Sequence, residues 1–331
     1  MQGWQHGHEM AGRRQLSLGL IVLLLYAGLS ACASSDEPAR GCGLEGSVAL
    51  TEPAPVLVFA CNLEPESRYH GDIVVMRPGE PARPLTHGEG WNYAPRWSPD
   101  GQKVVFGSTR SGSEQLYTMN ADGTHVTQLT HAESFIGLAA WSPDGTHLAF
   151  GSSAAGLTGP LGVIHAPSDI YVANADGTNA RRLTFSGGLN AEPAWSPDGR
   201  SIVFVSDRYG PYQVWVMNAD GTDQHPLTNV GQNGSPAWSP DGTHIVFHSE
   251  RDFPGGYRST IYVMASDGSE QHRLVAGEGG WPTWSPDGRW IVYAGGPQGV
   301  WDLYAVHPDG SGLTRITDNE SHEVDPSWAP A

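Results

Sequence analysis

Trp97-Ser98-Pro99-Asp100-Gly101 returns along this chain with unchanged sequence. Identical copies begin at Trp141, Trp195, Trp238 and Trp284, and a degenerate copy, Trp328-Ala329-Pro330, comes near the end. Successive tryptophans of these copies are 43 to 54 residues apart. A period of about 40 to 50 residues indicates a repeat architecture, and the four-stranded blades of propellers have this length.

The repeated stretch has the chemistry of a tight turn between two strands. Ser-Pro-Asp-Gly fits a type I turn with proline at the second position and glycine at the fourth. β-Branched and aromatic runs follow each copy, as in Val104-Val105-Phe106, and predict buried strands. Each repeat continues with a further strand-like run such as 115–119, a turn such as 120–123 and a short run ending in Leu-Thr. We therefore predict four antiparallel strands per repeat, with the repeat tryptophan packed between neighbouring repeats and not binding a ligand.

The unit Pro-x-Trp-Ser-Pro-Asp-Gly … Ile-Tyr-x-Met-x-x-Asp-Gly … Leu-Thr resembles the repeat of the TolB-type β-propeller family. The resemblance covers residues 56–328 and implies an all-β fold. It says less about function, because propellers carry many activities. Some pectate-degrading lyases are similar propellers that hold a metal with histidines, and no such set of histidines is recognisable in this sequence.

Counting the repeats predicts six blades. The first blade has three strand-like runs, at 56–59, 72–76 and 84–86, but no repeated pentapeptide before them. Residues 324–328 at the other end of the chain can supply its innermost strand. The predicted fold is thus an all-β, six-bladed β-propeller of four-stranded antiparallel blades, closed by the C-terminal strand completing blade one. Such closure removes the open sheet edges of a linear array.

The N-terminal region predicts export and anchoring. Residues 1–31 have Arg13-Arg14 followed by an apolar run, as in a signal peptide, with either Met1 or Met10 as the start. The ending Leu-Ser-Ala-Cys32 resembles a bacterial lipobox, so Cys32 is the predicted lipidation site of a lipoprotein; an ordinary signal peptide is the alternative. Residues 32–55 are rich in Ala, Ser, Pro, Glu and Gly and predict a flexible tether to the propeller at 56–331. We expect a protein that is lipid-anchored to the bacterial membrane and faces the periplasm or the cell exterior.

The cysteines predict a disulfide, and the net charge indicates which classes of partner are excluded. An exported protein meets oxidising conditions, so Cys42 and Cys61 are a predicted disulfide. The net charge of −17 at pH 7 argues against nucleic acid and against an anionic membrane surface as partners. It gives mild support to cationic ligands, metal ions or basic proteins. We expect a monomer.

Candidate binding residues lie in the loops that enter the innermost strands, where variable segments sit on a rigid scaffold. Amide or carboxylate side chains occupy the position five residues before four of the repeat tryptophans. Two carboxylates and one aromatic residue occupy the position three residues before others. Two further aromatic residues lie in or next to the first of these loops. The members are Asn92, Asn190, Asn233 and Glu323, then Glu192, Trp281 and Asp325, then Trp91 and Tyr93. Such a ring at the channel mouth can hold a sugar, a peptide terminus or a cation. A solvated funnel with local turn hydrogen bonds is the alternative. The recurring Ser-x-Arg of the loops at 108–110, 206–208 and 249–251 is interpreted as a structural contact between blades.

Motifs of catalysis are absent from the sequence. It has no nucleophile elbow, His-Glu-x-x-His, phosphate-binding loop or dinucleotide fingerprint. We therefore predict a non-catalytic envelope lipoprotein that binds a protein, peptide or glycan partner through its channel-mouth loops, with no catalytic residue, metal ligand or cofactor assigned. Binding of a divalent cation in the channel is left as an open alternative. The alternative is a metal-assisted carbohydrate lyase or hydrolase with its site in the propeller funnel.

Overall fold

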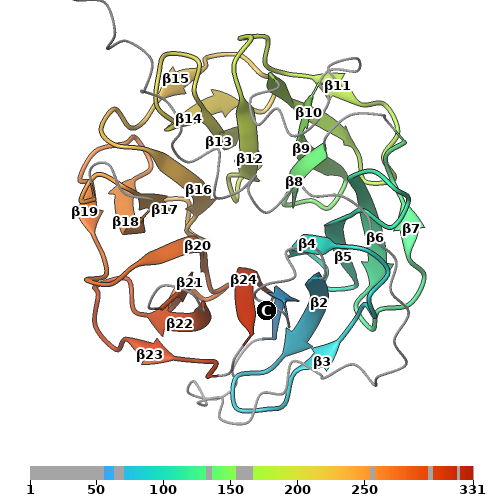
Figure 1. Cartoon of the computed structure of the whole chain (residues 1–331). Helices are drawn as coiled ribbons and strands as arrows, with labels where there is room; N and C mark the ends of the chain where they lie inside the picture. The colour runs from blue at the N-terminus through green and yellow to red at the C-terminus, as the bar shows by residue number, and fades with distance from the viewer. Residues whose placement is uncertain are drawn as a thin grey trace, which may run out of the picture.

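The computed structural model describes residues 56–62, 71–131, 136–153, 167–253, 258–296, 301–318 and 321–330. These residues form six four-stranded antiparallel sheets arranged as blades around a central channel (Figure 1). The predicted six-bladed all-β propeller is therefore confirmed. The predicted signal peptide and tether, with Cys32 and Cys42, lie outside the described residues. Within the described ranges there is no helix of a length and apolarity that would let it cross a membrane.

In blades 2 to 6 the strands follow one another along the chain from the innermost to the outermost, and blade 1 takes its innermost strand from the C-terminal part of the chain. Blade 1 consists of β24 (His322–Trp328), β1 (Leu57–Asn62), β2 (Gly71–Met76) and β3 (Arg83–Pro84). Blade 2 has β4 (Asn92–Trp97), β5 (Lys103–Ser108), β6 (Gln115–Asn120) and β7 (Thr127–Gln128), and blade 3 has β8 (Ile136–Trp141), β9 (His147–Ser153), β10 (Ser168–Asn174) and β11 (Arg181–Arg182). Blade 4 has β12 (Asn190–Trp195), β13 (Ser201–Ser206), β14 (Gln213–Asn218) and β15 (His225–Pro226). Blade 5 has β16 (Asn233–Trp238), β17 (His244–Ser249), β18 (Thr260–Ala265) and β19 (His272–Arg273), and blade 6 has β20 (Gly279–Trp284), β21 (Ile291–Gly295), β22 (Asp302–Val306) and β23 (Thr314–Arg315).

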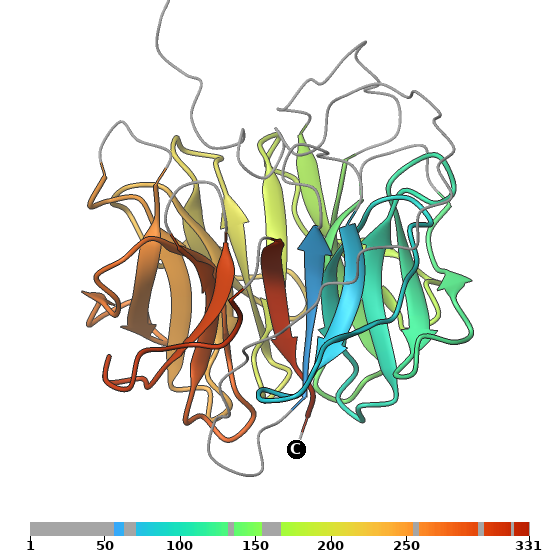
Figure 2. The same ribbon diagram turned by 60° about the horizontal axis from the view of Figure 1, so that its bottom comes forward.

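The two ends of the propeller sequence meet in blade 1. β24 pairs antiparallel with β1, with Leu57 opposite Trp328 and Cys61 opposite Glu323. Figure 2 shows the two strands side by side, β24 in dark red and β1 in blue. Beyond the strands, the Ala329 N–H donates to the Val56 carbonyl at 2.7 Å. The predicted closure of the ring by the C-terminal strand is confirmed.

The repeated pentapeptides form the turns at one end of the channel. In blade 2 the Gly101 N–H donates to the Ser98 carbonyl at 2.9 Å, as a type I turn requires, and Gly101 has a φ of 67°. The Asp100 carboxylate accepts hydrogen bonds from the Ser98 hydroxyl at 2.6 Å and the Gln102 N–H at 3.0 Å. We call this end of the channel the turn rim. The turns between the third and fourth strands lie at the same end, since the Ala121 N–H donates to the Gln102 carbonyl at 2.9 Å. The opposite end, where the remaining loops connect strands and blades, is the loop rim (Figure 2, top).

The hydrophobic core consists of six layers, one in each gap between neighbouring blades. In the gap between blades 1 and 2, Val58 and Ile73 pack against Phe106 and Met119, and Trp97 closes the layer toward the channel. The other repeat tryptophans occupy equivalent gaps. Burying one large apolar side chain stabilises the fold by about 1.5 to 3 kcal/mol. The predicted packing of the tryptophans between repeats is confirmed, and the blades stay in place because each shares a core with both neighbours.

Candidate functional site

A β-bulge in the innermost strands decides which side chains enter the channel. In β4, Tyr93 is opposite Gly107 and Arg96 is opposite Val105, so β4 has one residue more than its partner strand. The bulged residue lies third before the repeat tryptophan and has a positive φ in five blades: Ala94 (49°), Glu192 (53°), Ser235 (47°), Trp281 (50°) and Asp325 (55°). This conformation costs a non-glycine residue about 1 to 2 kcal/mol. A bulge bends the strand and redirects the side chain, and we call these five residues the bulge layer.

The bulge separates the predicted site residues into two groups, because it breaks the alternation of faces along the strand. Asn92, Asn190, Asn233 and Glu323 lie ahead of the bulge and are buried, with at most 2 % of their surface exposed. They point into the gaps between blades. Glu192, Trp281 and Asp325 belong to the bulge layer.

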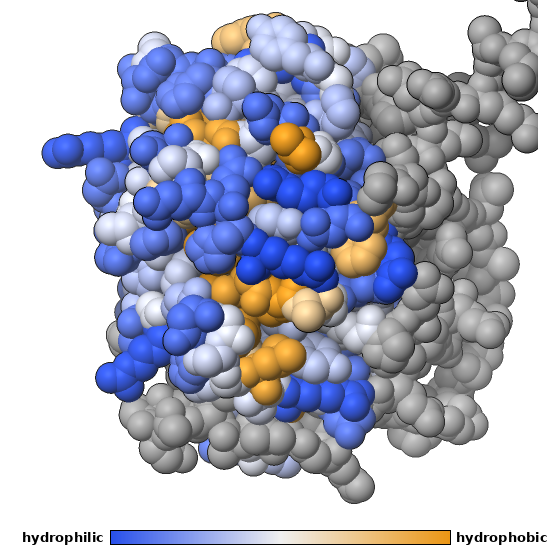
Figure 3. Space-filling view, turned by 90° about the vertical axis from the view of Figure 1, so that its left-hand side faces the viewer, coloured by the Kyte–Doolittle hydropathy of each residue, from blue (hydrophilic) through white to orange (hydrophobic). Residues whose placement is uncertain are grey.

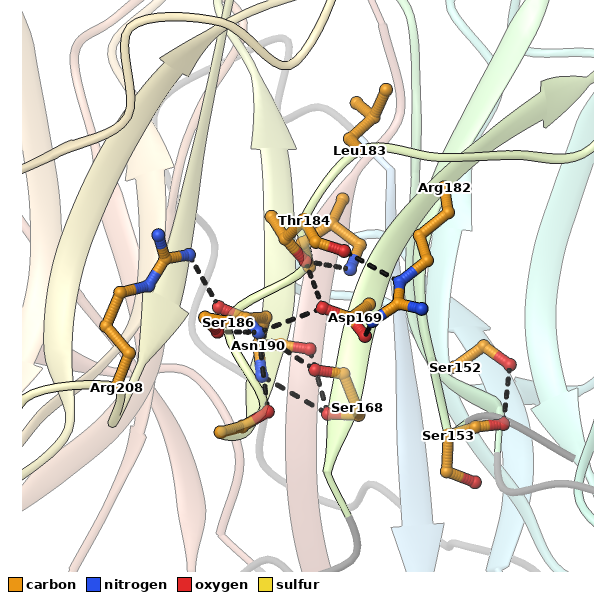
Figure 4. Close-up of polar contacts among 12 residues, drawn as sticks. Ser152, Ser153, Ser168, Asp169, Arg182, Leu183, Thr184, Ser186, Asn190 and Arg208 are labelled. Carbon is orange, nitrogen blue, oxygen red and sulfur yellow. Dashed lines mark hydrogen bonds and ion pairs between the residues drawn. The ribbon is translucent and has the colours of Figure 1, made fainter. Parts of the chain in front are cut away.

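Asn190 shows what the first group does (Figure 4). Its Nδ2 donates to Ser186 Oγ at 2.8 Å and to the Ser168 carbonyl of blade 3 at 2.9 Å. Its Oδ1 accepts from Arg208 Nη2 at 2.8 Å. Asp169, which pairs with Arg182, accepts a further bond from Asn190 Nδ2 at 3.3 Å. Asn190 thus links blades 3 and 4 through their backbone and charged side chains.

The same arrangement recurs around the ring. Asn92 Oδ1 accepts from Arg110 Nη2 at 2.9 Å, and Asn233 Oδ1 accepts from Arg251 Nη2 at 3.2 Å. The arginines of the Ser-x-Arg loops therefore hold the asparagines of their own blades, and the asparagine makes the contact to the preceding blade, as with Asn92 Nδ2 and the Gly71 carbonyl at 3.1 Å. The Glu323 carboxylate accepts from the Thr317 and Ser321 hydroxyls at 2.9 and 2.8 Å. All four residues of this group serve the framework, and their ligand role stays a prediction.

The rings of Trp91 and Tyr93 pack against each other, with centroids 4.7 Å apart and planes tilted by 32°. The Tyr93 ring is buried over Gly107, where an added Cβ would come within 2.3 Å of it. Burial raises the pKa of the Tyr93 hydroxyl well above its usual range, and the nearby charges of Glu114 and Asp325 add to the shift. Tyr93 is thus part of the core, whereas Trp91 is half-buried at the loop rim.

Three charged side chains meet at the middle of the channel. Glu192 Oε2 accepts from the Ser235 N–H at 2.6 Å, and the Asp325 carboxylate accepts from the Ala94 N–H. Burial raises the pKa of both carboxyls and lowers the pKa of Arg96. Arg96 Nη1 donates to the Pro95 and Asp325 carbonyls at 2.8 and 3.3 Å.

Sequence reasoning missed Arg96 and Ser235. Arg96 had a signal, because it is the only charged residue that directly precedes a repeat tryptophan. Sequence reasoning also missed His248. The His248 ring lies beside Gly234, where an added Cβ would come within 2.6 Å of the ring. Burial lowers the pKa of this histidine to about 4.

A cavity of about 370 Å³ occupies the half of the channel nearer the turn rim. The bulge-layer residues Glu192, Ser235 and Trp281 form part of its inner end, and prolines of the turns such as Pro99 and Pro197 line its outer end. Trp91, Tyr93 and the four buried framework residues do not line it. The predicted site residues are therefore spread over the gaps, the channel and the loop rim.

The loop rim carries exposed hydrophobic side chains around blade 4. Phe185, Tyr209 and Val230 have 72 %, 86 % and 55 % of their surface exposed. Their loops are neighbours, because the Leu189 N–H donates to Asp207 Oδ1 at 2.7 Å and the Asn233 N–H to the Tyr212 carbonyl at 2.9 Å. On the side face shown in Figure 3, hydrophobic residues form patches that hydrophilic residues interrupt.

The described His, Cys, Asp and Glu side chains bear on metal binding and on the disulfide. In the described ranges no three His, Cys, Asp or Glu side chains are grouped so that they could hold a metal ion. Cys61 is disulfide-bonded. Its predicted partner, Cys42, lies outside the described residues.

Comparison with known proteins places the chain in a family. The model of the TolB β-propeller domain matches residues 75–159 and 164–330. The chain is 34 % identical over 247 residues to "Protein TolB homolog" of Chlorobium luteolum, covering 74 % of this chain and 53 % of the relative. It is 40 % identical over 131 residues to "Tol-Pal system protein TolB" of Bordetella pertussis, covering 39 % of this chain and 28 % of the relative. The chain thus matches about half or less of the length of these relatives.

Solved structures share the fold. TolB from Acinetobacter baumannii superimposes with a TM-score of 0.70 at 21 % identity, over 84 % of this chain and 67 % of that one. An oligogalacturonate lyase in complex with manganese superimposes with a TM-score of 0.54 at 16 % identity, over 82 % of this chain and 76 % of the lyase. At these identities the likeness concerns the fold alone. The family match over most of the propeller shows that the chain belongs to the TolB β-propeller family.

Proposed function

We propose that this protein is a non-catalytic component of the bacterial cell envelope that binds a protein partner with its loop rim. Two curated relatives are TolB proteins, one of them named as part of the Tol-Pal system. The predicted signal peptide and the lipid anchor at Cys32 support the same location. The rigid ring of blades provides a scaffold, and its loops differ from one another in length and sequence, as binding loops do.

The exposed side chains of Phe185, Tyr209 and Val230 carry this proposal. Single exposed hydrophobic residues are common on protein surfaces, but large aromatic ones gathered on adjacent loops mark contact sites. Both aromatic rings are already positioned: the Arg182 guanidinium lies 4.6 Å from the Phe185 ring centroid, and the Tyr209 ring lies 5.6 Å from that of Trp215. A partner that covers these rings loses little side-chain entropy on binding.

Aromatic residues of blades 2 and 6, across the channel from these loops, extend the proposed surface. Trp281 and Trp301 pack edge to face with centroids 5.2 Å apart, and Trp91 is half-buried beside Tyr93. A peptide segment of the partner can insert between these aromatic residues. We propose a monomer that engages a protein or peptide in this way; a glycan partner is the second outcome to test.

Capture of the partner from envelope extract tests the proposal. The variant Phe185→Ala/Tyr209→Ala should fold with an unchanged melting temperature and lose the partner that the native chain retains. The matched control, Val126→Ala/Leu313→Ala, removes exposed hydrophobic side chains that lie between the turns at Gly123 and Gly310 and the outermost strands β7 and β23, and should retain it. If the loop-rim variant captures the partner as well as the native chain does, the proposed surface is wrong.

The enzyme alternative has no specific observation in its favour. The oligogalacturonate lyase shares the fold only, and metal-ligand groups of three are not found among the described side chains. Metal analysis of the purified protein decides the matter, since a stoichiometric ion lost on Glu192→Gln substitution would support a metal site in the channel.

A further inference from the structure

The turn-rim half of the channel has the form of a ligand pocket. The cavity of about 370 Å³ has mostly apolar walls of tryptophan, proline and alanine. Its tryptophans are Trp97, Trp141, Trp195, Trp238, Trp281 and Trp328. A mainly apolar concavity with a few convergent polar groups is the usual form of a small-molecule site. This cavity lies toward the end of the channel opposite the loop rim, and of the residues named for the partner surface above only Trp281 also lines it.

Arg96 and Glu192 are the charged residues among those that line the cavity, and they come from different blades. Arg96 on β4 is held through Nη1 by the Pro95 and Asp325 carbonyls, and the Asp325 charge acts on it. Its charge is therefore partly balanced. Glu192 on β12 receives the Ser235 N–H and makes no ion pair within 4 Å among the described residues. Among the described residues in the middle of the channel there are thus two carboxyls, Glu192 and Asp325, and one guanidinium, Arg96.

Ser235 provides a second, independent observation. Its side chain lines the cavity with only 9 % of its surface exposed, and its Oγ makes no hydrogen bond of normal geometry. The hydroxyl nevertheless lies close enough to Glu192 to lower the pKa of that carboxyl. The contact with Glu192 leaves part of the hydrogen-bonding capacity of this buried hydroxyl unused, and a ligand donor or acceptor at this point would use it.

The aspartates at the mouth of the cavity outnumber the cations beside them: Arg200 and Arg289 pair with Asp198 and Asp287 at 4.0 and 3.8 Å, and Lys103 acts on Asp100. Each intact pentapeptide places one aspartate at the turn rim, where hydrogen bonds from its serine and the backbone keep its pKa low; the five are Asp100, Asp144, Asp198, Asp241 and Asp287. For Asp144 and Asp241 the pKa falls to about 2. Ionised carboxylates around a low-dielectric opening attract cations and raise their local concentration.

We propose that this turn-end cavity binds an organic cation, with the ammonium or guanidinium group of the ligand between the Glu192 carboxylate and the Ser235 hydroxyl. The tryptophan and proline walls take the apolar part of the ligand. Aromatic walls with a carboxylate suit organic cations. The described residues offer no group of three metal ligands here, which favours an organic cation over a metal ion.

The pH dependence of binding has a defined sign. Burial and the Asp325 charge raise the pKa of Glu192, and Arg96 opposes the shift. A bound cation favours the ionised carboxylate, so binding releases protons and weakens as the pH falls. The other titratable groups near Glu192 are His248 on β17 and Tyr212 before β14.

Calorimetric titration of the full chain with benzylammonium tests the proposal, with benzyl alcohol, benzoate and Ca²⁺ as comparison probes. Benzylammonium should bind at least roughly tenfold more tightly than the alcohol or benzoate, because a charge-assisted hydrogen bond adds to the apolar contact. Glu192→Gln should remove this preference. The matched control, Asp198→Asn, changes a rim carboxylate that does not line the cavity and should alter binding less than about threefold at physiological salt.

Other results would overturn the assignment. Equal binding of benzyl alcohol means an apolar pocket only, and tighter binding of benzoate means that Arg96 determines the ligand. Stoichiometric Ca²⁺ binding that depends on Glu192 means a metal site instead. If Glu192→Gln does not fold, Ser235→Ala replaces it: weaker benzylammonium binding with release of protons supports the proposal, and unchanged binding refutes it. Loss of partner capture at the loop rim leaves all these results unaffected.

Discussion

Removal of the Asn190 side chain is the most demanding test of how neighbouring blades are held together. In the variant Asn190→Ala, the Arg208 guanidinium loses its 2.8 Å contact and the Ser168 carbonyl loses its donor at 2.9 Å. The Asp169 carboxylate loses a weaker bond of 3.3 Å. Hydrogen bonds to charged groups contribute about 1.5 to 3 kcal/mol each, and a neutral one about 1 kcal/mol. Because Asn190 is fully buried, water replaces these contacts poorly, and we expect a loss of about 3 kcal/mol in the free energy of unfolding.

Thermal unfolding followed by tryptophan fluorescence measures this loss. For a domain of this size, about 3 kcal/mol lowers Tm by roughly 5 °C. The matched control is Asn229→Ala, because Asn229 is exposed and in the loop before β16, and a surface change of this kind alters stability by about 0.5 kcal/mol or less. If both variants melt within about 1 °C of each other, Asn190 does not link the blades as we describe.

Two further predictions concern a close contact and a buried carboxyl. Gly107→Ala places a Cβ 2.3 Å from the Tyr93 ring and should lower Tm by several degrees in the same assay, whereas Gly277→Ala, where no atom lies within 4 Å, should change it little; equal effects would contradict the packing. Burial raises the pKa of Glu250 to about 7, above its value in the unfolded chain. The protonated carboxyl therefore contributes fully to the free energy of unfolding below the unfolded pKa, and this contribution is lost as the pH rises through 7. Glu250→Gln should therefore gain about 1 to 2 kcal/mol over the native chain between pH 5 and pH 8 in urea unfolding, and a difference that does not vary with pH would refute this reasoning.

Local sequence carried most of the information about the fold. Ser-Pro-Asp-Gly turns act through a proline with fixed φ and a glycine that accepts positive φ, so their positions mark the hairpins whatever lies far away in the sequence. The missing innermost strand of blade 1 then follows from counting. The pairing of β1 with β24 confirms it.

The candidate site was harder to predict because the bulge is not visible in the sequence. Strict alternation would place Asn190 and Glu192 on one face of β12. The extra residue between Ala191 and Ala194 breaks the alternation, so Asn190 points into the blade gap and Glu192 into the channel. The positive φ of Glu192, ahead of a proline, is imposed by the register of the whole sheet and has no local signal. Arg96 was detectable by aligning the repeats, but its contacts with the Asp325 carbonyl depend on ring closure.

The closed ring is the central claim, and one truncation tests it most directly. A chain that ends at residue 318 lacks β24, the innermost strand of blade 1, which pairs with β1 and contributes Trp328 to the core between blades 1 and 6. Thermal unfolding by tryptophan fluorescence should show one cooperative transition at a Tm far below that of the full chain, because every blade depends on its neighbours. An unchanged Tm, or the loss of a small separate transition with the main one intact, would show that the C-terminal strand does not close the propeller.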